Sequence, residues 1–202
     1  MRTAIIIASI LFFSFTIIHG DKKEVESLIG KEVSDFSLLN VDGKYISTQD
    51  YKGAKGFIVI FTCNHCPFAK LYTDRLQQLH ETFSALGVPV LAINSMDTVV
   101  YEEEKFAQMQ LVAKRDSLVF PFLQDGAQVV GQNFAASRTP QAFVIWKREN
   151  KWVIEYSGAI DDNGEHPELA TPFIANAVNE LLLDKPVSNP ETQAFGCKIF
   201  YR

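Results

Sequence analysis

The feature that most constrains the fold of this chain is an apolar run that ends at a pair of cysteines. Residues 57–61 read Phe-Ile-Val-Ile-Phe, a composition typical of a strand buried on both faces. The motif Cys63-Asn64-His65-Cys66-Pro67 follows almost at once. Apolar residues then recur at helical spacing from Phe68 to Leu86, and Gly87 ends the pattern. The predicted order is therefore strand, Cys-x-x-Cys, helix.

The predicted position of the two cysteines favours thiol chemistry. A thiol at the N-terminus of a helix lies near unpaired backbone N–H groups and the positive end of the helix dipole, and both lower its pKa. We expect Cys63 to be the attacking thiol and Cys66 the resolving one, because two intervening residues let one sulfur reach the other. His65 can carry a positive charge, which would favour the Cys63 thiolate and make the disulfide easier to reduce.

Two other interpretations of the pair remain open. The cysteines could form half of a zinc site, but the sequence contains no second Cys-x-x-Cys or His-x3-His, and Cys197 stands alone near the C-terminus. They could also form an inert disulfide, although a domain of this size needs no such staple. The sequence therefore predicts a redox site with no metal ligand and no cofactor.

The N-terminal residues have the pattern of a secretory signal peptide. Arg2 precedes an apolar stretch from Ala4 to Ile18, and charged residues follow Gly20. We expect residues 1–20 to be removed by cleavage near Gly20, with an uncleaved anchor as the alternative. The protein would then be periplasmic or secreted, with no stable membrane insertion after signal removal, and residues 21–29 would form an exposed segment.

Composition limits the class of protein further. With 202 residues, of which 47% are hydrophobic, the chain suits one globular domain, which we place at residues 30–185 with a C-terminal tail at residues 186–202. The net charge is −5 and the basic residues form no stripe, which argues against binding of nucleic acid.

The other patterns predict an α/β arrangement. Asp42-Gly43 between two strand-like runs indicates a hairpin, and a buried strand at residues 88–94 implies a parallel pair with the strand before the cysteines. Three further elements are predicted: a helix starting near Asp97 or Thr98 whose first turn holds the solvated acids Glu102, Glu103 and Glu104, an antiparallel hairpin of residues 142–146 and 152–156, and an amphipathic helix at residues 169–183.

Together these residues resemble the thioredoxin-like superfamily, and within it the redoxin group that includes alkyl hydroperoxide reductase-like and thiol-disulfide exchange proteins. The resemblance depends on these segments: Phe36-x-Leu38, Asp42-Gly43-Lys44, Gly56 to Pro67, Ala92 to Ser95, Phe120-Pro121-Phe122, Thr139-Pro140 and Gly158 to Asp161. It implies an α/β thioredoxin-like fold, with a central mixed β-sheet flanked by helices and an N-terminal β-hairpin extension.

The resemblance also implies a substrate-binding edge. Thr139-Pro140 would be a cis peptide that faces the cysteine pair, with the Thr139 backbone available to an extended substrate strand. We add Asn64 and His65, between the two cysteines, as candidate substrate-binding residues.

The chain departs from its resemblances at two places. Thioredoxins carry a buried Asp six residues before the first Cys, and Phe57 stands there in this chain, so the sequence offers no general base for Cys66. Peroxiredoxins need Pro-x-x-x-Thr/Ser-x-x-Cys, and neither Cys63 nor Cys66 fits that spacing.

The function predicted from these features is an exported thiol-disulfide oxidoreductase that acts on protein or small thiol substrates. Its partners would be thiol or disulfide proteins, or a membrane reductase. One alternative is an atypical thiol peroxidase with Cys197 as a distant resolving thiol, although Cys197 could also be an exposed, unpaired thiol on the tail. The other alternative is a copper-binding metallochaperone that uses Cys63, Cys66 and His166, because copper(I) prefers thiolates with an imidazole.

Overall fold

The computed structural model describes residues 27–202. The predicted signal peptide, and most of the segment predicted to be exposed at residues 21–29, lie outside the described residues.

Eight strands of the described part form one mixed sheet. They are β1 Glu32–Val33, β2 Ser37–Asn40, β3 Tyr45–Ser47, β4 Gly56–Phe61, β5 Val90–Asn94, β6 Phe122–Gln124, β8 Gln141–Arg148 and β9 Lys151–Gly158. Their order across the sheet is β1-β9-β8-β4-β5-β6-β2-β3. Two short strands, β7 Arg138–Thr139 and β10 Cys197–Lys198, pair with each other outside this sheet.

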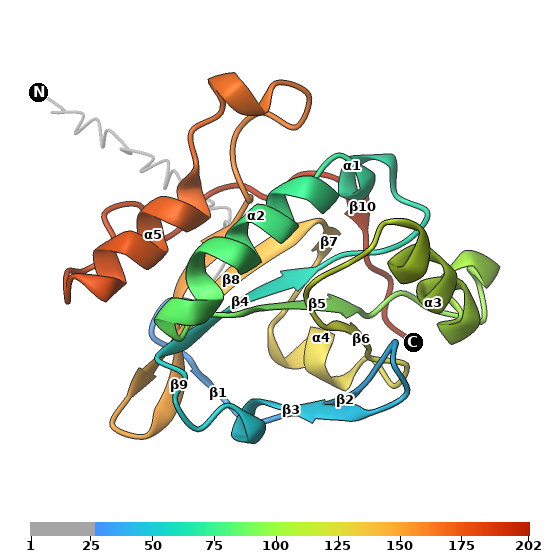
Figure 1. Ribbon diagram of the computed structural model, residues 1–202, viewed down its shortest axis with the longest axis horizontal. Coiled ribbons are helices and arrows are strands. Elements are labelled where there is room, and N and C mark those ends of the chain that lie inside the picture. The colour runs from blue at the N-terminus through green and yellow to red at the C-terminus, as the bar shows by residue number, and fades with distance from the viewer. Residues whose placement is uncertain (1–26) are drawn as a thin grey trace, which may run out of the picture.

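Five α-helices accompany the sheet (Figure 1): α1 Pro67–Lys70, α2 Thr73–Phe83, α3 Phe106–Arg115, α4 Val129–Asn133 and α5 Phe173–Leu182. Four 3-10 turns complete the described elements: η1 Thr48–Asp50, η2 Ser84–Leu86, η3 Glu102–Glu104 and η4 Pro167–Leu169.

Strand β4, which leads to the cysteines, lies at the centre of the sheet. It pairs parallel with β5 and antiparallel with β8, and all six of its residues are buried. Ile58 and Ile60 face a core that includes residues of α2 and α5, whereas Phe57 and Phe61 face a second core that includes residues of α4 and the C-terminal segment. Helices therefore cover both faces, as the continuous apolar run predicts.

The predicted N-terminal hairpin is present as β2 and β3. Gly43 has φ +84° in its turn, and the side chain of Asp42 accepts the Lys44 N–H at 2.9 Å. Strand β2 also pairs antiparallel with β6, so the hairpin continues the central sheet at its edge.

The single helix predicted from Phe68 to Leu86 is wrong in one respect, because the helix breaks near its start. The N–H groups of Leu71 and Tyr72 bond three residues back, to Phe68 and Ala69, which tightens the chain between α1 and α2. This turn buries Tyr72 completely but leaves Phe68 46% and Leu71 44% exposed. Phe68 and Leu71 are therefore not core residues.

The helix predicted to start near Asp97 begins later. Lys105 has extended dihedral angles, so it separates the 3-10 turn η3 from α3, and the three glutamates lie before the helix. The chain turns at η3, and this turn directs Glu104 into the protein interior.

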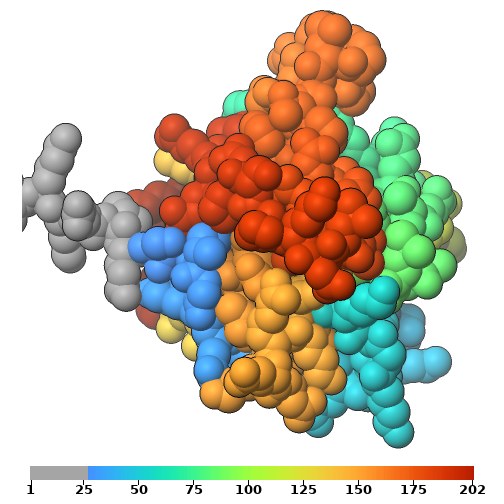
Figure 2. Space-filling view, turned by 90° about the vertical axis from the view of Figure 1, so that its left-hand side faces the viewer, coloured from blue at the N-terminus to red at the C-terminus, as the bar shows by residue number. Residues whose placement is uncertain are grey.

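The C-terminal half follows its predicted pattern. Strands β8 and β9 form the expected antiparallel hairpin. Glu149 and Asn150, at φ +47° and +69°, form its two-residue turn, and positive φ at both positions suits the right-handed twist of the two strands. Residues 165–169 are exposed and form the projection at the top of Figure 2. Between residues 27 and 202, no helix has the length and apolar character needed to cross a bilayer.

Candidate active site

The two cysteines lie at the junction between β4 and α1, as the sequence predicts. Pro67 occupies the first turn of α1, where its missing N–H costs no helical hydrogen bond, and Cys66 is the residue that precedes the helix. Both thiols are free. They are also enclosed, because Cys63 is 5% exposed and Cys66 is fully buried.

Thr139 lies against both sulfurs. The Cys63 Sγ is 3.1 Å from the Thr139 hydroxyl oxygen, and the Cys66 thiol donates to the Thr139 carbonyl at 3.1 Å. The Thr139-Pro140 peptide is cis. The structure therefore brings the pair Cys63 and Cys66 together with the Thr139-Pro140 peptide, which lies more than seventy residues further along the chain.

Glu104 is a fully buried carboxylate beneath this site. Its oxygens accept the backbone N–H of Asn64 at 2.9 Å, the backbone N–H of His65 at 2.9 Å and the side-chain amide of Asn94 at 2.6 Å. The interpretation of this residue as part of a solvated turn is wrong, whereas its neighbour Glu102 is exposed as expected. A buried carboxylate needs such donors, and here they come from the loop between the two cysteines and from the end of β5.

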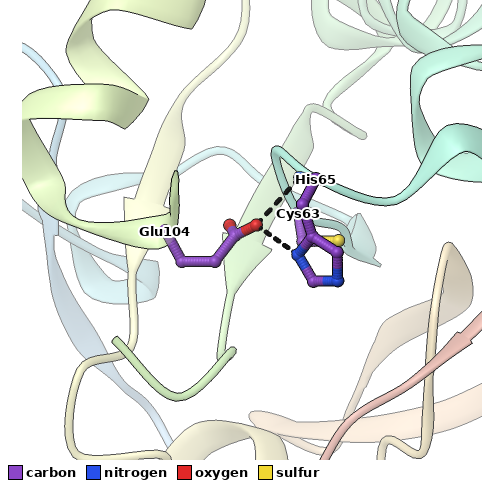
Figure 3. Close-up of side chains that lie close together, drawn as sticks. All are labelled: Cys63, His65 and Glu104. Atoms are coloured by element: carbon purple, nitrogen blue, oxygen red, sulfur yellow. Dashed lines mark hydrogen bonds and ion pairs between the residues drawn. The ribbon is translucent and has the colours of Figure 1, made fainter. Parts of the chain in front are cut away.

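His65 completes a compact group with Glu104 and Cys63 (Figure 3). The His65 Nδ1 is 2.6 Å from Glu104 Oε1, and the imidazole stacks on the Tyr101 ring with centroids 4.6 Å apart. Because Glu104 accepts the three other hydrogen bonds already described, it acts as an acceptor toward His65 as well. His65 therefore donates to a buried carboxylate and also lies close to Cys63.

The donor atoms of Cys63, His65 and Glu104 lie within 4.8 Å of one another, a spacing that a metal ion could use. However, both Glu104 oxygens already accept hydrogen bonds, which a metal would have to displace. The copper set proposed with His166 is wrong: in the part of the chain that the structure describes, His166 is not a member of this group. It is exposed and lies 3.4 Å from Glu168.

Asn64 is held in place on two sides. Besides its backbone contact with Glu104, its amide nitrogen donates to the Glu103 carbonyl at 2.6 Å, and the residue is 8% exposed. Its side-chain oxygen is buried and has no hydrogen-bond partner among residues 27–202. Asn64 therefore keeps one free acceptor next to Cys63 in the chain.

The hydrogen bond between the two thiols separates their pKa values. The Cys63 thiol donates to the Cys66 sulfur, which lowers the pKa of Cys66 and raises that of Cys63. Burial and the charge of Glu104 raise the pKa of Cys63 further, while the Cys197 thiol and the Ala69 N–H help to lower the pKa of Cys66. In the neutral pair the Cys66 thiol donates to the Thr139 carbonyl. When the pair loses one proton, these interactions favour the negative charge on Cys66, whereas the sequence led us to expect it on Cys63.

Cys197 is half-buried and packs against the core that contains the cysteine pair, so it is not an exposed thiol on a free tail. Strand β10 pairs antiparallel with β7, in a register that sets Cys197 opposite Thr139. Phe57, at the position of the acid in thioredoxins, is fully buried and packs on the Trp152 ring with centroids 4.9 Å apart.

Comparison with known proteins places this geometry in a family. Residues 29–156, more than half of the chain, match the AhpC/TSA family. The chain belongs to the AhpC/TSA family. A relative, the thiol-disulfide oxidoreductase ResA of Bacillus cereus, is 26% identical over 145 residues, which cover 71% of this chain and 79% of the relative.

Solved structures related to this AhpC/TSA chain agree on the fold. An uncharacterized conserved protein from Geobacillus kaustophilus is 30% identical, with a TM-score of 0.78 over 86% of this chain and 92% of that one. A thiol:disulfide interchange protein of the thioredoxin family from Chlorobium tepidum is 20% identical, with a TM-score of 0.51 over 63% of this chain and 85% of that one. The predicted α/β thioredoxin-like fold is confirmed.

The burial of Glu104 and the pairing of Cys197 with β7 were not predicted. Nothing in the sequence separates Glu104 from the two glutamates before it, because its burial depends on donors that come from other elements. Cys197 lies in a strand of two residues, which is too short to show the alternation of apolar and polar residues by which a strand is recognised.

Proposed function

We propose that this protein is an exported thiol-disulfide oxidoreductase that cycles Cys63 and Cys66 between the dithiol and the disulfide. The observation that carries the proposal is the contact of both sulfurs with Thr139, at 3.1 Å in each case. The relative named thiol-disulfide oxidoreductase supports the same class of reaction.

In the oxidised protein, a partner thiolate attacks the Cys63 sulfur. A bond forms between the partner sulfur and Cys63, the Cys63–Cys66 bond breaks, and Cys66 leaves as a thiolate. A thiol of low pKa leaves faster, and the Cys197 thiol and the Ala69 N–H, which remain available as donors when Cys63 is bonded to the partner, lower the pKa of Cys66. A second partner thiol then attacks the partner's own sulfur, which releases Cys63 and leaves the partner with a disulfide. The reverse sequence reduces a disulfide partner.

Glu104 acts in this scheme as a positioning residue. It holds the backbone N–H groups of Asn64 and His65, and so fixes the loop that separates the two sulfurs. Its charge also raises the pKa of Cys63, which keeps a single negative charge in the buried dithiol pair.

We assign substrate binding to the edge formed by Thr139 and Pro140, with Asn64 and His65 beside it. Support comes from the contacts of Thr139 with both sulfurs and from the free acceptor on Asn64. The signal-like N-terminus supports export to an oxidising compartment, the periplasm or the exterior. There the pair would exchange with thiol or disulfide proteins, or with a membrane reductase.

The test uses the purified chain equilibrated in glutathione buffers of defined potential, followed by alkylation and mass spectrometry of the cysteine peptides. We expect a reversible Cys63–Cys66 disulfide, and we expect Cys63→Ser to abolish catalysis of insulin reduction by a dithiol. Cys66→Ser should instead accumulate a mixed disulfide at Cys63. Retained turnover in Cys63→Ser would sink the proposal, and rapid peroxide consumption by the reduced protein would favour the thiol peroxidase instead.

A further inference from the structure

The last residues of the chain occupy the edge that we assign to the substrate. Strand β10 lies beside β7 (Figure 1), with Cys197 opposite Thr139. The pairing continues beyond the strand, because the Ile199 N–H donates to the Ser137 carbonyl at 2.9 Å. Residues 196–202, which we call the tail strand, thus add to β7 as an extended partner peptide would.

The tail strand fits this edge closely. Gly196 has φ +122°, and a Cβ on it would lie 2.2 Å from the Thr139 carbonyl oxygen, so only glycine fits there. Arg138 donates to the Gly196 carbonyl at 2.9 Å, and Ile199 is 3% exposed. Contacts on both sides of Cys197 therefore fix where its sulfur lies.

That position is against the redox pair. Thr139 contacts the Cys63 and Cys66 sulfurs from β7, and Cys197 faces Thr139 from the tail strand. Cys197 packs against the same core cluster as the pair, and its thiol is close enough to Cys66 to lower the pKa of that residue. Cys63 is only 5% exposed, and the tail strand occupies the edge of Thr139, which contacts its sulfur.

We propose that the tail strand is a built-in substitute for the partner strand and that Cys197 is a third redox-active thiol, an inference that rests on the proposed Cys63–Cys66 couple. The Cys197 thiolate attacks the Cys66 sulfur of the oxidised pair. A Cys66–Cys197 bond forms, the Cys63–Cys66 bond breaks, and Cys63 takes up the proton that Cys197 lost. One disulfide replaces another, so the step needs no outside oxidant.

The exchange is tested by disulfide mapping in the full chain, oxidised with glutathione disulfide, quenched in acid and alkylated. We expect wild-type protein to show a fraction with Cys66–Cys197 joined and Cys63 alkylated. Cys63→Ser should form the Cys66–Cys197 disulfide about tenfold faster than Cys66→Ser forms a Cys63–Cys197 disulfide, because the Cys197 thiol contacts Cys66. Equal rates, or no disulfide to Cys197 in either variant, would overturn the proposal.

The occupancy of the edge is tested by freeing the tail strand. Gly196→Val should raise the alkylation rate of Cys63 in the reduced protein by about tenfold. The valine weakens the pairing of the tail strand with β7, so the strand detaches more often and the reagent reaches Cys63 more often. Phe200→Ala is the matched control, because the Phe200 side chain is 55% exposed. In this variant we expect the alkylation rate of Cys63 to stay within about twofold of wild type. Ile199→Ser provides the same test if the valine variant does not fold. An unchanged rate in a folded variant would refute the covering role.

The two proposals fail differently. If no Cys63–Cys66 disulfide forms in either wild type or Cys197→Ser, the proposed function is wrong. If that disulfide forms and turns over but Cys197 never exchanges and the alkylation rates do not change, only the inference about the tail strand is wrong.

Discussion

Replacement of Glu104 by Gln tests whether the buried carboxylate organises the site. The amide keeps the shape of the side chain but has a single acceptor oxygen. If that oxygen faces His65, the amide nitrogen faces the Asn94 amide, which already donates to Glu104 at 2.6 Å. The side-chain amide of Asn94 cannot flip without losing a second hydrogen bond, because its oxygen accepts the Met96 N–H at 3.0 Å.

The variant therefore loses at least one buried hydrogen bond, and the bonds that remain are no longer charge-assisted. An unsatisfied buried donor costs about 1–3 kcal/mol, and hydrogen bonds to a charged group are worth about twice the neutral ones, so we expect a loss of about 2–4 kcal/mol. Urea unfolding of the reduced protein measures this loss. The control is Glu102→Gln, whose side chain is 75% exposed and which should lose no more than about 1 kcal/mol.

A double variant sharpens the test. Asn94→Asp alone places two carboxylates in contact and should destabilise the protein, whereas Asn94→Asp combined with Glu104→Gln restores a donor facing an acceptor. The double variant should thus be more stable than the sum of the single effects by about 1 kcal/mol or more. Loss of the Glu104 charge should also lower the pKa of Cys63. The reasoning is refuted if Glu104→Gln is as stable as its control and the cycle shows no coupling.

Three further predictions concern the sulfurs, the core and the loop before α5. Cys63→Ala removes the leading hydrogen bond to Cys66, so the pKa of Cys66 should rise, and the ultraviolet absorbance of its thiolate should appear at higher pH than in wild type. Phe57→Ala should cost about 3–5 kcal/mol in urea unfolding, because the ring is fully buried, while the reduction potential stays unchanged. Arg75→Met leaves the buried Asp161 without its ion pair and should cost about 3–5 kcal/mol, with faster proteolysis at residues 162–170; equal cleavage rates would contradict this role.

The sequence was sufficient to predict the centre of this structure, because that part depends on local pattern. A continuous apolar run, a cysteine pair and a Pro at the first turn specify β4 and the start of α1 without any distant contact. That the Thr139-Pro140 peptide faces the cysteines was predicted only from the resemblance to a family, because no local sequence pattern connects Thr139 with Cys63.

What could not be predicted depends on contacts between distant segments. Glu104 is buried because donors from the cysteine loop and from β5 converge on it, and residue type alone does not distinguish it from Glu102. The break after Lys70 likewise reflects a tertiary contact, since the Tyr72 hydroxyl donates to Asp161 at 2.9 Å from inside the core. The spacing of apolar residues along one segment cannot predict such a contact, because it carries no information about distant segments.

The pairing of β10 with β7 has a consequence for the choice of partners. A segment tethered to its own binding edge competes at an effective concentration that is commonly on the order of millimolar. If the tail strand covers the redox pair as we propose, an incoming peptide must displace it before its sulfur meets Cys63, so protein partners that bind the edge weakly exchange slowly. Selectivity then arises from a threshold affinity set by seven residues of the chain itself, rather than from a pocket that recognises one particular side chain.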